Sequence, residues 1–330
     1  AYYLSGASDR LGRGADGNTV CDFDPEEIRR KASVSLALLP VEWKDTKMNL
    51  LDTPGLFDFA GGKSEGFRAA GSTVIVVSGK SGVTVGAEKA FDAATKKGIA
   101  KLFFVNKLDN ENADFYKVFE ELKTRFGPMV CPLVVPYVED RRVQCYVNLL
   151  EYKAYAYENG KAVERPLPDM GHRLDGLRTA INEAVAETDE ELMEKYFSGE
   201  DFTYAEMIQG LRQGVRELSL FPVLCGSAVS TMGSLMLMDN IVELLPNPVE
   251  GNMRKGMLPS GDKEEYAVSP GGVPSAFVFK TVSDQYGKYS FIKVLSGNIT
   301  PDLTLVDSRT GSSEKLGRLY QMRGKKAEEV

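Results

Sequence analysis

Histidine is almost absent from this 330-residue sequence, in which His172 is the only one. The sequence therefore argues against a Ser/His/Asp triad and excludes a histidine-rich metal site. The four cysteines form no Cys-x-x-Cys pair, which fits reduced thiols in a cytosolic protein. No run reaches 18 uncharged apolar residues, and the first residues lack the pattern of a signal peptide. We expect a cytoplasmic protein with no membrane span.

The overall composition is that of a soluble globular protein, with 43% apolar and 26% charged residues. The length favours two domains over one. The net charge is −7, yet residues 251–330 carry more basic than acidic side chains. A mildly basic end suits a nucleic-acid surface but is weak evidence for one. We expect no DNA partner.

The first half of the chain alternates apolar runs with helical patterns. Two runs, "STVIVV" and "KLFFVN", are continuously apolar, as in strands that are covered on both faces. The predicted strands are Ser33–Leu39, Lys47–Leu51, Thr73–Ser78 and Lys101–Asn106, and the predicted helices are Ala87–Lys97 and Ala113–Phe126. This order predicts an α/β fold with a mostly parallel sheet and flanking helices.

Residues 131–220 interrupt that alternation and read as an inserted α+β subdomain. Antiparallel strands are expected around a turn at Asn159–Gly160, followed by helices at Asp175–Glu187 and Asp189–Phe197. A strand returns at "LFPVLC", and Leu235–Leu245 reads as a helix. Residues 251–273 read as a linker, and residues 274–330 as the start of an antiparallel β-barrel.

The most informative motif is Asn106-Lys107-Leu108-Asp109, which follows the apolar run "KLFFV". Open α/β sheets bind ligands at the carboxyl ends of their parallel strands. A carboxylate at Asp109 can accept hydrogen bonds from guanine N1–H and its 2-amino group, whereas adenine cannot donate both. Asn106 would tie the neighbouring loops to the base, and the Lys107 stem would lie along the ring.

A second motif, Asp52-Thr53-Pro54-Gly55, follows an earlier apolar strand. Asp52 would bind magnesium through a water molecule, and the Gly55 N–H would contact a terminal phosphate, because glycine lets the backbone approach closely. Taken alone, this tetrapeptide is more typical of an ordinary turn. Its position two βα units before Asn106 makes the pair indicative of a GTPase.

A third motif, Gly226-Ser227-Ala228, follows the strand "FPVLC". Small residues there would let backbone N–H groups reach the guanine O6. By itself the tripeptide carries no information, and its value lies in its order after the other two motifs.

Residues 15–330 resemble the N-terminal part of elongation factor G, a translational GTPase. The segments "DTPGLFDF", "NKLDNENADF", "CGSA", "ELLPNP" and "PSAFVFKTVSD" stand in that family's order. The resemblance implies a GTP-binding domain at residues 1–250, truncated at its N-terminus and interrupted by the insertion at 131–220. A linker at 251–273 and an incomplete β-barrel domain at 274–330 would follow. It also implies binding of GTP or GDP with Mg²⁺, and hydrolysis coupled to translocation on the ribosome.

The segment "DGNTVCDFDPEEIRRKASVSLAL" occupies the family's switch I position and is less typical of it. It is closer to divergent elongation-factor-G-like proteins and to ribosome-protection factors. Ser33 stands where the family has a magnesium-binding threonine, and the resemblance therefore implies that Ser33 and Asp52 are magnesium ligands.

Leu56 is the first departure from the family, which has a water-orienting histidine at this position. Leucine offers no hydrogen bond, so hydrolysis is expected to be slow unless another group places the water. Alternatively, Leu56 packs against switch I in a working enzyme.

The phosphate-binding pattern Gly-x-x-x-x-Gly-Lys-Ser/Thr is the second departure, because none of the 330 residues matches it. The Gly-Lys-Ser tripeptides at 62–64 and 79–81 lack the earlier glycine and follow the Asp-Thr-Pro-Gly motif, in the wrong order. We expect a chain that begins inside the helix after the true loop, and that on its own is inactive. A non-catalytic ribosome-binding scaffold and a ribosome-protection-type resistance GTPase are the alternative functions.

Overall fold

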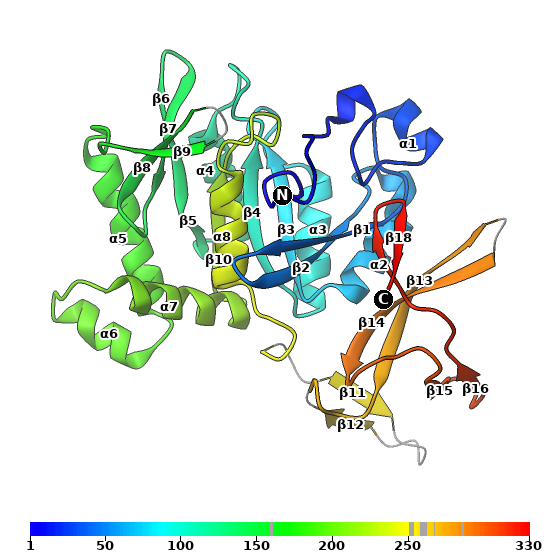
Figure 1. Cartoon of the computed structure of the whole chain (residues 1–330). Helices are drawn as coiled ribbons and strands as arrows, with labels where there is room; N and C mark the ends of the chain where they lie inside the picture. The colour runs from blue at the N-terminus through cyan, green and yellow to red at the C-terminus, as the bar shows by residue number, and fades with distance from the viewer. Residues whose placement is uncertain (159–160, 251–253, 258–262, 267, 285–286) are drawn as a thin grey trace. The chain divides into compact units, whose positions relative to one another are not determined.

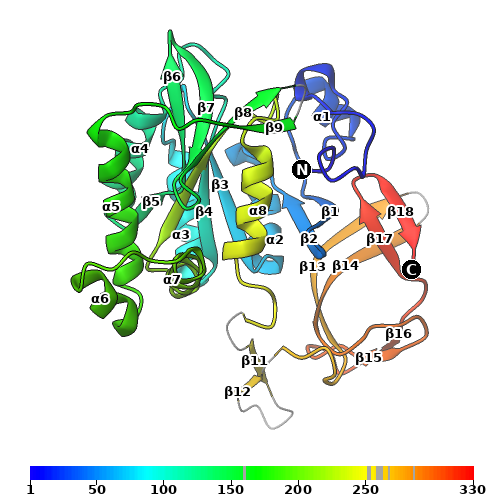
Figure 2. The same ribbon diagram turned by 60° about the vertical axis from the view of Figure 1, so that its left-hand side comes forward.

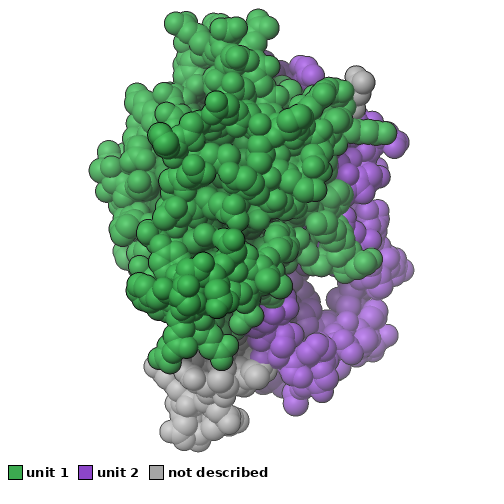
Figure 3. Space-filling view, turned by 90° about the vertical axis from the view of Figure 1, so that its left-hand side faces the viewer, with its two compact units in different colours: residues 1, 43–46, 72–246 green, residues 2–42, 47–71, 247–330 purple. Residues whose placement is uncertain are grey.

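The computed structural model describes residues 1–330 except 159–160, 251–253, 258–262, 267 and 285–286 (Figure 1). The chain divides into two compact units. Unit 1 comprises residues 1, 43–46 and 72–246, and unit 2 comprises residues 2–42, 47–71 and 247–330 (Figure 3). The domain boundaries expected from the sequence stay predictions. No described helix is long and apolar enough to cross a membrane.

A four-stranded parallel sheet lies at the centre of unit 1. Its order is β3-β4-β10-β5, with β3 at Ser72–Ser78, β4 at Ala100–Asn106, β10 at Phe221–Cys225 and β5 at Val130–Pro132. Every residue of β10 is buried, and so is all of β4 except Asn106. This burial explains why β4 reads as a continuous apolar run. The same expectation was wrong for β3, which lies at the edge of this sheet and leaves Val76 57% exposed. The predicted parallel α/β fold is confirmed.

Helices cover the sheet, with α3 and α8 on opposite faces (Figures 1 and 2). The helices that pack on it include α3 (Val85–Lys96), α4 (Phe115–Phe126), α7 (Tyr204–Glu217) and α8 (Ser234–Leu244). Asp114 caps the N-terminus of α4 by accepting a hydrogen bond from Lys117 N, and Phe115, Val118, Phe119 and Leu122 are buried. Their helical spacing made this element predictable.

The predicted insertion is an antiparallel sheet followed by two helices. Strand order is β6-β7-β8-β9, with β6 at Val134–Glu139, β7 at Arg142–Asn148, β8 at Lys153–Glu158 and β9 at Lys161–Arg165. Helices α5 (His172–Ala186) and α6 (Glu190–Phe197) follow. The predicted turn at Asn159–Gly160 lies outside the described residues, although Glu158 and Lys161 on either side of it are paired.

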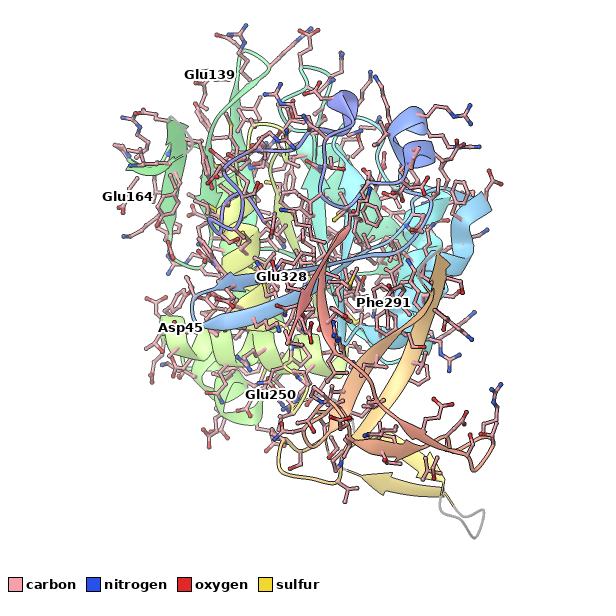
Figure 4. All side chains as sticks on the ribbon, turned by 45° about the vertical axis from the view of Figure 1, so that its right-hand side comes forward. Asp45, Glu139, Glu164, Glu250, Phe291 and Glu328 are labelled. Carbon is pink, nitrogen blue, oxygen red and sulfur yellow. The ribbon has the colours of Figure 1, made fainter. Side chains whose placement is uncertain are left out.

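Unit 2 contains the first elements of the chain, except for residues 43–46, which lie at the turn between the first two strands and belong to unit 1. These elements are a 3-10 turn η1 (Gly14–Asp16), helix α1 (Pro25–Arg30), strands β1 (Ala37–Trp43) and β2 (Thr46–Asp52), a second 3-10 turn η2 (Phe57–Phe59) and helix α2 (Ala60–Ala69). Strands β1 and β2 pair across a two-residue turn at Lys44 and Asp45, both with positive φ (Figure 4).

One strand boundary differs from the prediction of Ser33–Leu39, because β1 begins only at Ala37. Residues 33–35 alternate like a strand but do not pair with β2. The Glu27 carboxylate accepts hydrogen bonds from the backbone N–H groups of Val34 and Ser35 instead. The Glu27 side chain therefore takes the place of a neighbouring strand as hydrogen-bond acceptor. The alternation of polar and apolar residues does not reveal such a substitution.

The C-terminal part of unit 2 is a series of antiparallel pairs. They are β11 (Arg254–Met257) with β12 (Lys263–Tyr266), β13 (Ser275–Asp284) with β14 (Gly287–Ser296), β15 (Thr304–Val306) with β16 (Ser313–Lys315), and β17 (Tyr320–Arg323) with β18 (Lys326–Glu329). The expected antiparallel β-rich end is therefore present, and the first pair lies within the stretch that reads as a linker. Phe291 of β14 packs against Phe279, with ring centroids 6.1 Å apart (Figure 4).

Candidate functional site

Two of the predicted base-binding motifs are held together in unit 1. Asn106 is the last residue of β4, and its side-chain oxygen accepts hydrogen bonds from the backbone N–H groups of Lys107 at 2.7 Å and Ala228 at 2.9 Å. Backbone bonds reinforce this link, since Gly226 N donates to Val105 O and Leu108 N donates to Gly226 O. The structure therefore brings Asn106-Lys107-Leu108-Asp109 and Gly226-Ser227-Ala228 to one end of neighbouring strands.

Gly226 and Ser227 belong to this arrangement for steric reasons. A Cβ at Gly226 would lie 2.2 Å from Met232 O, so only glycine fits. Ser227 is fully buried, donates its N–H to Met232 O at 2.8 Å and accepts a hydrogen bond from Ser230 N. These contacts fix the backbone of the loop that carries Ala228.

The side chains that would meet a base point outward. Leu108 is buried and anchors the loop, whereas Lys107 and Asp109 are exposed. Within the described residues, neither of these two side chains forms a hydrogen bond or ion pair. Lys107 has a backbone φ of +66°, in the left-handed region that residues other than glycine rarely adopt. This conformation produces the sharp turn after β4. The Asp109 carboxylate is thus free to accept hydrogen bonds from a ligand.

One backbone N–H that was predicted to contact the base already has a hydrogen-bond partner within the protein. The Ala228 N–H, expected to reach the guanine O6, donates to Asn106 in this structure. Base binding through that N–H requires this bond to give way, while the Asn106 amide nitrogen stays available as a donor.

Gly79, which begins the tripeptide at 79–81, lies beneath the same loop. Its N–H donates to Asn106 O, and its carbonyl accepts from Asp114 N. A Cβ there would lie 2.6 Å from the Leu108 side chain. Gly79 is therefore a packing residue of the base-binding end rather than a phosphate-binding glycine.

The other predicted motif, Asp52-Thr53-Pro54-Gly55, lies in unit 2, beginning at the last residue of β2. Helix α2 folds back onto it through two glycines. A Cβ at Gly62 would lie 2.9 Å from Pro54 Cδ, and one at Gly66 would lie 2.7 Å from Thr53 Cγ2. The tripeptide at 62–64 is thus explained by helix packing.

Gly55 differs from these two glycines. A Cβ there would meet no atom within 4 Å, and its φ is not positive. Neither packing nor backbone conformation therefore requires glycine at this position. Close approach of a ligand to the backbone would require it, which fits a phosphate contact. Lys63 of α2 donates to the Gly55 carbonyl at 3.1 Å.

The two predicted magnesium residues, Asp52 and Ser33, both interact with Asp22, which was not predicted as a site residue. The Ser33 hydroxyl donates to Asp22 at 2.6 Å, and Asp22 in turn lies close enough to Asp52 to act on it electrostatically. Desolvation and the negative charges of Asp22 and Glu27 raise the pKa of Asp52, against a hydrogen bond from the Cys21 thiol that lowers it. Burial and the Asp52 carboxylate raise the pKa of that thiol.

These residues fit a magnesium ion that is shared with phosphates. Among the residues that the structure describes, no three His, Cys, Asp or Glu side chains are grouped to hold a metal on their own. Mg²⁺ is usually held by one or two carboxylates together with waters and substrate phosphates. A cation here would also relieve the mutual repulsion of Asp22 and Asp52.

Leu56 lies at the surface, 46% exposed, and is followed by Phe57, which is 53% exposed. Its apolar side chain offers no group that could orient a water. The high exposure also does not support tight packing of Leu56 against the switch I segment in this conformation.

Sequence reasoning missed Cys21, Asp22 and Glu27. Cys21 and Asp22 carry no motif. Glu27 did leave a signal, because Asp24-Pro25-Glu26-Glu27 is a capping-box pattern with proline at the first helical position. That signal locates helix α1 but not the hydrogen bonds that Glu27 makes beyond it.

Comparison with known proteins agrees with these motifs. The family model described as the elongation factor Tu GTP binding domain matches residues 2–247. A crystal structure of ttk003000868 from Thermus thermophilus is similar to the whole chain, with a TM-score of 0.87 and 32% sequence identity. The match covers 100% of this chain and 47% of that one, so the chain spans about half the length of this relative.

Proposed function

The chain belongs to the translational GTPases that share the elongation factor Tu GTP-binding domain, and from this premise we propose that it binds guanine nucleotides through Asn106, Lys107 and Asp109. The observation that carries the proposal is the bond between Asn106 and Ala228, which joins the two predicted base-binding motifs, while Asp109 has no hydrogen-bond or ion-pair partner among the described residues. A carboxylate that a bound base covers favours a ligand that donates two hydrogen bonds, as guanine does.

For the Asp52–Gly55 motif of unit 2 we propose a role in binding the phosphates of the nucleotide. Asp52 would hold Mg²⁺ through a water, Ser33 would supply a hydroxyl ligand, and the Gly55 N–H would contact the terminal phosphate. Bound Mg²⁺ would neutralise charge on the phosphate oxygens. The Ser33 hydroxyl would then exchange its bond to Asp22 for one to the ion.

In the complete protein we assign this site to GTP hydrolysis in the cytoplasm, coupled to translocation on the ribosome. Family membership and the similarity to the Thermus structure support this assignment. The test is nucleotide-dependent binding to ribosomes, followed by a translocation assay. Ribosome binding that does not differ between GTP and GDP would contradict it.

A non-catalytic ribosome-binding scaffold is the second candidate. The exposed Leu56 favours it, since no hydrogen-bonding side chain stands where the family orients its water. The two candidates differ in ribosome-stimulated phosphate release, which the scaffold would lack. Multiple turnovers of GTP by the complete protein on ribosomes would eliminate the scaffold.

A further inference from the structure

Glu27 is a buried carboxylate that forms no ion pair within the described parts of the chain. Glu27 is only 1% exposed and lies on the short helix α1 of unit 2. Burying a charge is costly unless hydrogen bonds replace the lost water. Around Glu27 those bonds come from backbone N–H groups.

Each oxygen of the carboxylate binds a different end of the same segment. One oxygen accepts from Phe23 N and Asp24 N, both at 3.1 Å. The other accepts from Val34 N at 3.0 Å and Ser35 N at 3.2 Å. A single side chain therefore closes residues 23–35 into a loop around α1.

A second hydrogen bond connects the same two ends of the segment. Ser33 is joined to Asp22 by the hydrogen bond between their side chains. Both residues are direct neighbours of the amides that Glu27 binds. All these bonds have a carboxylate as acceptor, and Glu27 accepts four of them, so Glu27 controls the spacing of Asp22 and Ser33 more than their own single bond does.

Helix α1 cannot hold this geometry by itself. It has six residues, and an isolated helix of that length is unstable in water. Its capping box uses the Glu27 bond to Asp24, so that helix and loop depend on the same carboxylate. Removing the charge at Glu27 should release the segment that carries Ser33.

We propose that Glu27 is a positioning residue for magnesium, holding Ser33 and Asp22 beside Asp52. This inference rests on the proposed guanine-nucleotide function. Glu27 touches neither ion nor nucleotide in this account and acts only through the backbone that it binds.

The test compares Glu27→Gln with Glu26→Gln in the complete protein. Glutamine at 27 keeps the shape but presents an NH₂ group to one pair of donors, so one end of the loop is lost. Glu26 is the matched control, because the side chain of this neighbouring glutamate bonds to Arg29 and Arg30 on the surface. Should Glu27→Gln not fold, Glu27→Asp keeps the charge on a shorter stem that cannot reach both ends.

Two readouts separate positioning from general stability. Amide exchange at Phe23, Asp24, Val34 and Ser35 should quicken about tenfold or more in Glu27→Gln, while amides in β4 stay unchanged. The Mg²⁺ concentration that gives half-maximal GTP affinity should rise by about tenfold, while GDP affinity measured in EDTA stays the same.

Unchanged Mg²⁺ dependence in Glu27→Gln, with normal GTP binding by the wild type, would overturn this inference alone. Absence of guanine-nucleotide binding by the wild type would overturn the proposed function and this inference with it. A rise of equal size in Glu26→Gln would also overturn the inference, since that side chain lies outside the loop closure.

Discussion

Lys101 allows a direct test of how much the burial of one charged side chain in the parallel sheet lowers the free energy of unfolding. Its side chain is fully buried in β4, and its Nζ has no hydrogen-bond partner in the described chain. The ammonium lies 4.7 Å from the ring centroids of both Phe91 and Phe221. Desolvation lowers the pKa of Lys101 from 10.5 to about 8.

The magnitude follows from that pKa. A change from 10.5 to about 8 means that burial disfavours the charged form by about 3 kcal/mol. Attraction to the two ring faces offsets part of this cost, at about 0.5–1 kcal/mol for each cation–π contact. We expect Lys101→Met, which keeps an unbranched apolar stem, to raise the free energy of unfolding at pH 7 by about 1–3 kcal/mol.

The lowered pKa of Lys101 also determines how the stability difference between wild type and Lys101→Met changes with pH. Below pH 8, Lys101 is charged in both the folded and the unfolded chain, so the full penalty is present. Between pH 8 and 10.5 the folded chain releases its proton first, and wild-type stability therefore rises relative to that of the variant. The advantage of Lys101→Met should shrink by most of its size between pH 7 and pH 10.

Urea denaturation of both proteins at pH 7 and pH 10 measures this difference. Lys97→Met is the control, because Lys97 is exposed at the end of α3, and it should change stability by less than about 0.5 kcal/mol. A stability gain that is the same at both pH values, or a loss at pH 7, would refute the reasoning.

Three further predictions concern unit 2 and the nucleotide. Leu56→His should raise single-turnover GTP hydrolysis on ribosomes by up to about 10²–10⁴-fold if a water-orienting group is missing, and an unchanged rate would show that Leu56 is not the defect. Gly62→Ala should lower the free energy of unfolding by about 1–3 kcal/mol through its contact with Pro54, whereas Gly61→Ala, with open space around its Cβ, should raise it by up to about 1 kcal/mol. The 330-residue chain, which has no Gly-x-x-x-x-Gly-Lys-Ser/Thr match, should bind GTP far more weakly than the complete protein, and submicromolar affinity in calorimetry would contradict this.

The sequence allowed the elements of unit 1 to be predicted closely, because their signals are local. The helix expected at Ala113–Phe126 is found at Phe115–Phe126, and the strand expected at Lys101–Asn106 is found at Ala100–Asn106. Periodicity sets a helix face, and continuous burial sets a parallel strand. The base-binding motifs could be located by their position at strand ends.

Side-chain contacts between neighbouring elements were not predictable in the same way. Residues 33–35 alternate like a strand, yet Glu27 takes the amides of Val34 and Ser35. The sequence showed that Gly62 of α2 is not part of a phosphate loop, but it gave no reason for a glycine there, which the contact with Pro54 supplies. In each case the deciding partner is a side chain seven or eight residues earlier, outside the pattern of the element itself.

Asp109 is the residue that we propose selects guanine. Calorimetry on the complete protein, with GTP and xanthosine triphosphate as ligands, tests this proposal most directly in wild type, Asp109→Asn and the exposed control Glu111→Gln. Each charged hydrogen bond lost should cost roughly 1.5–3 kcal/mol, so Asp109→Asn should bind GTP at least about tenfold more weakly. The variant should instead prefer xanthosine triphosphate, whose C2 carbonyl can accept from the new amide. Equal GTP affinity in wild type and Asp109→Asn would contradict the account.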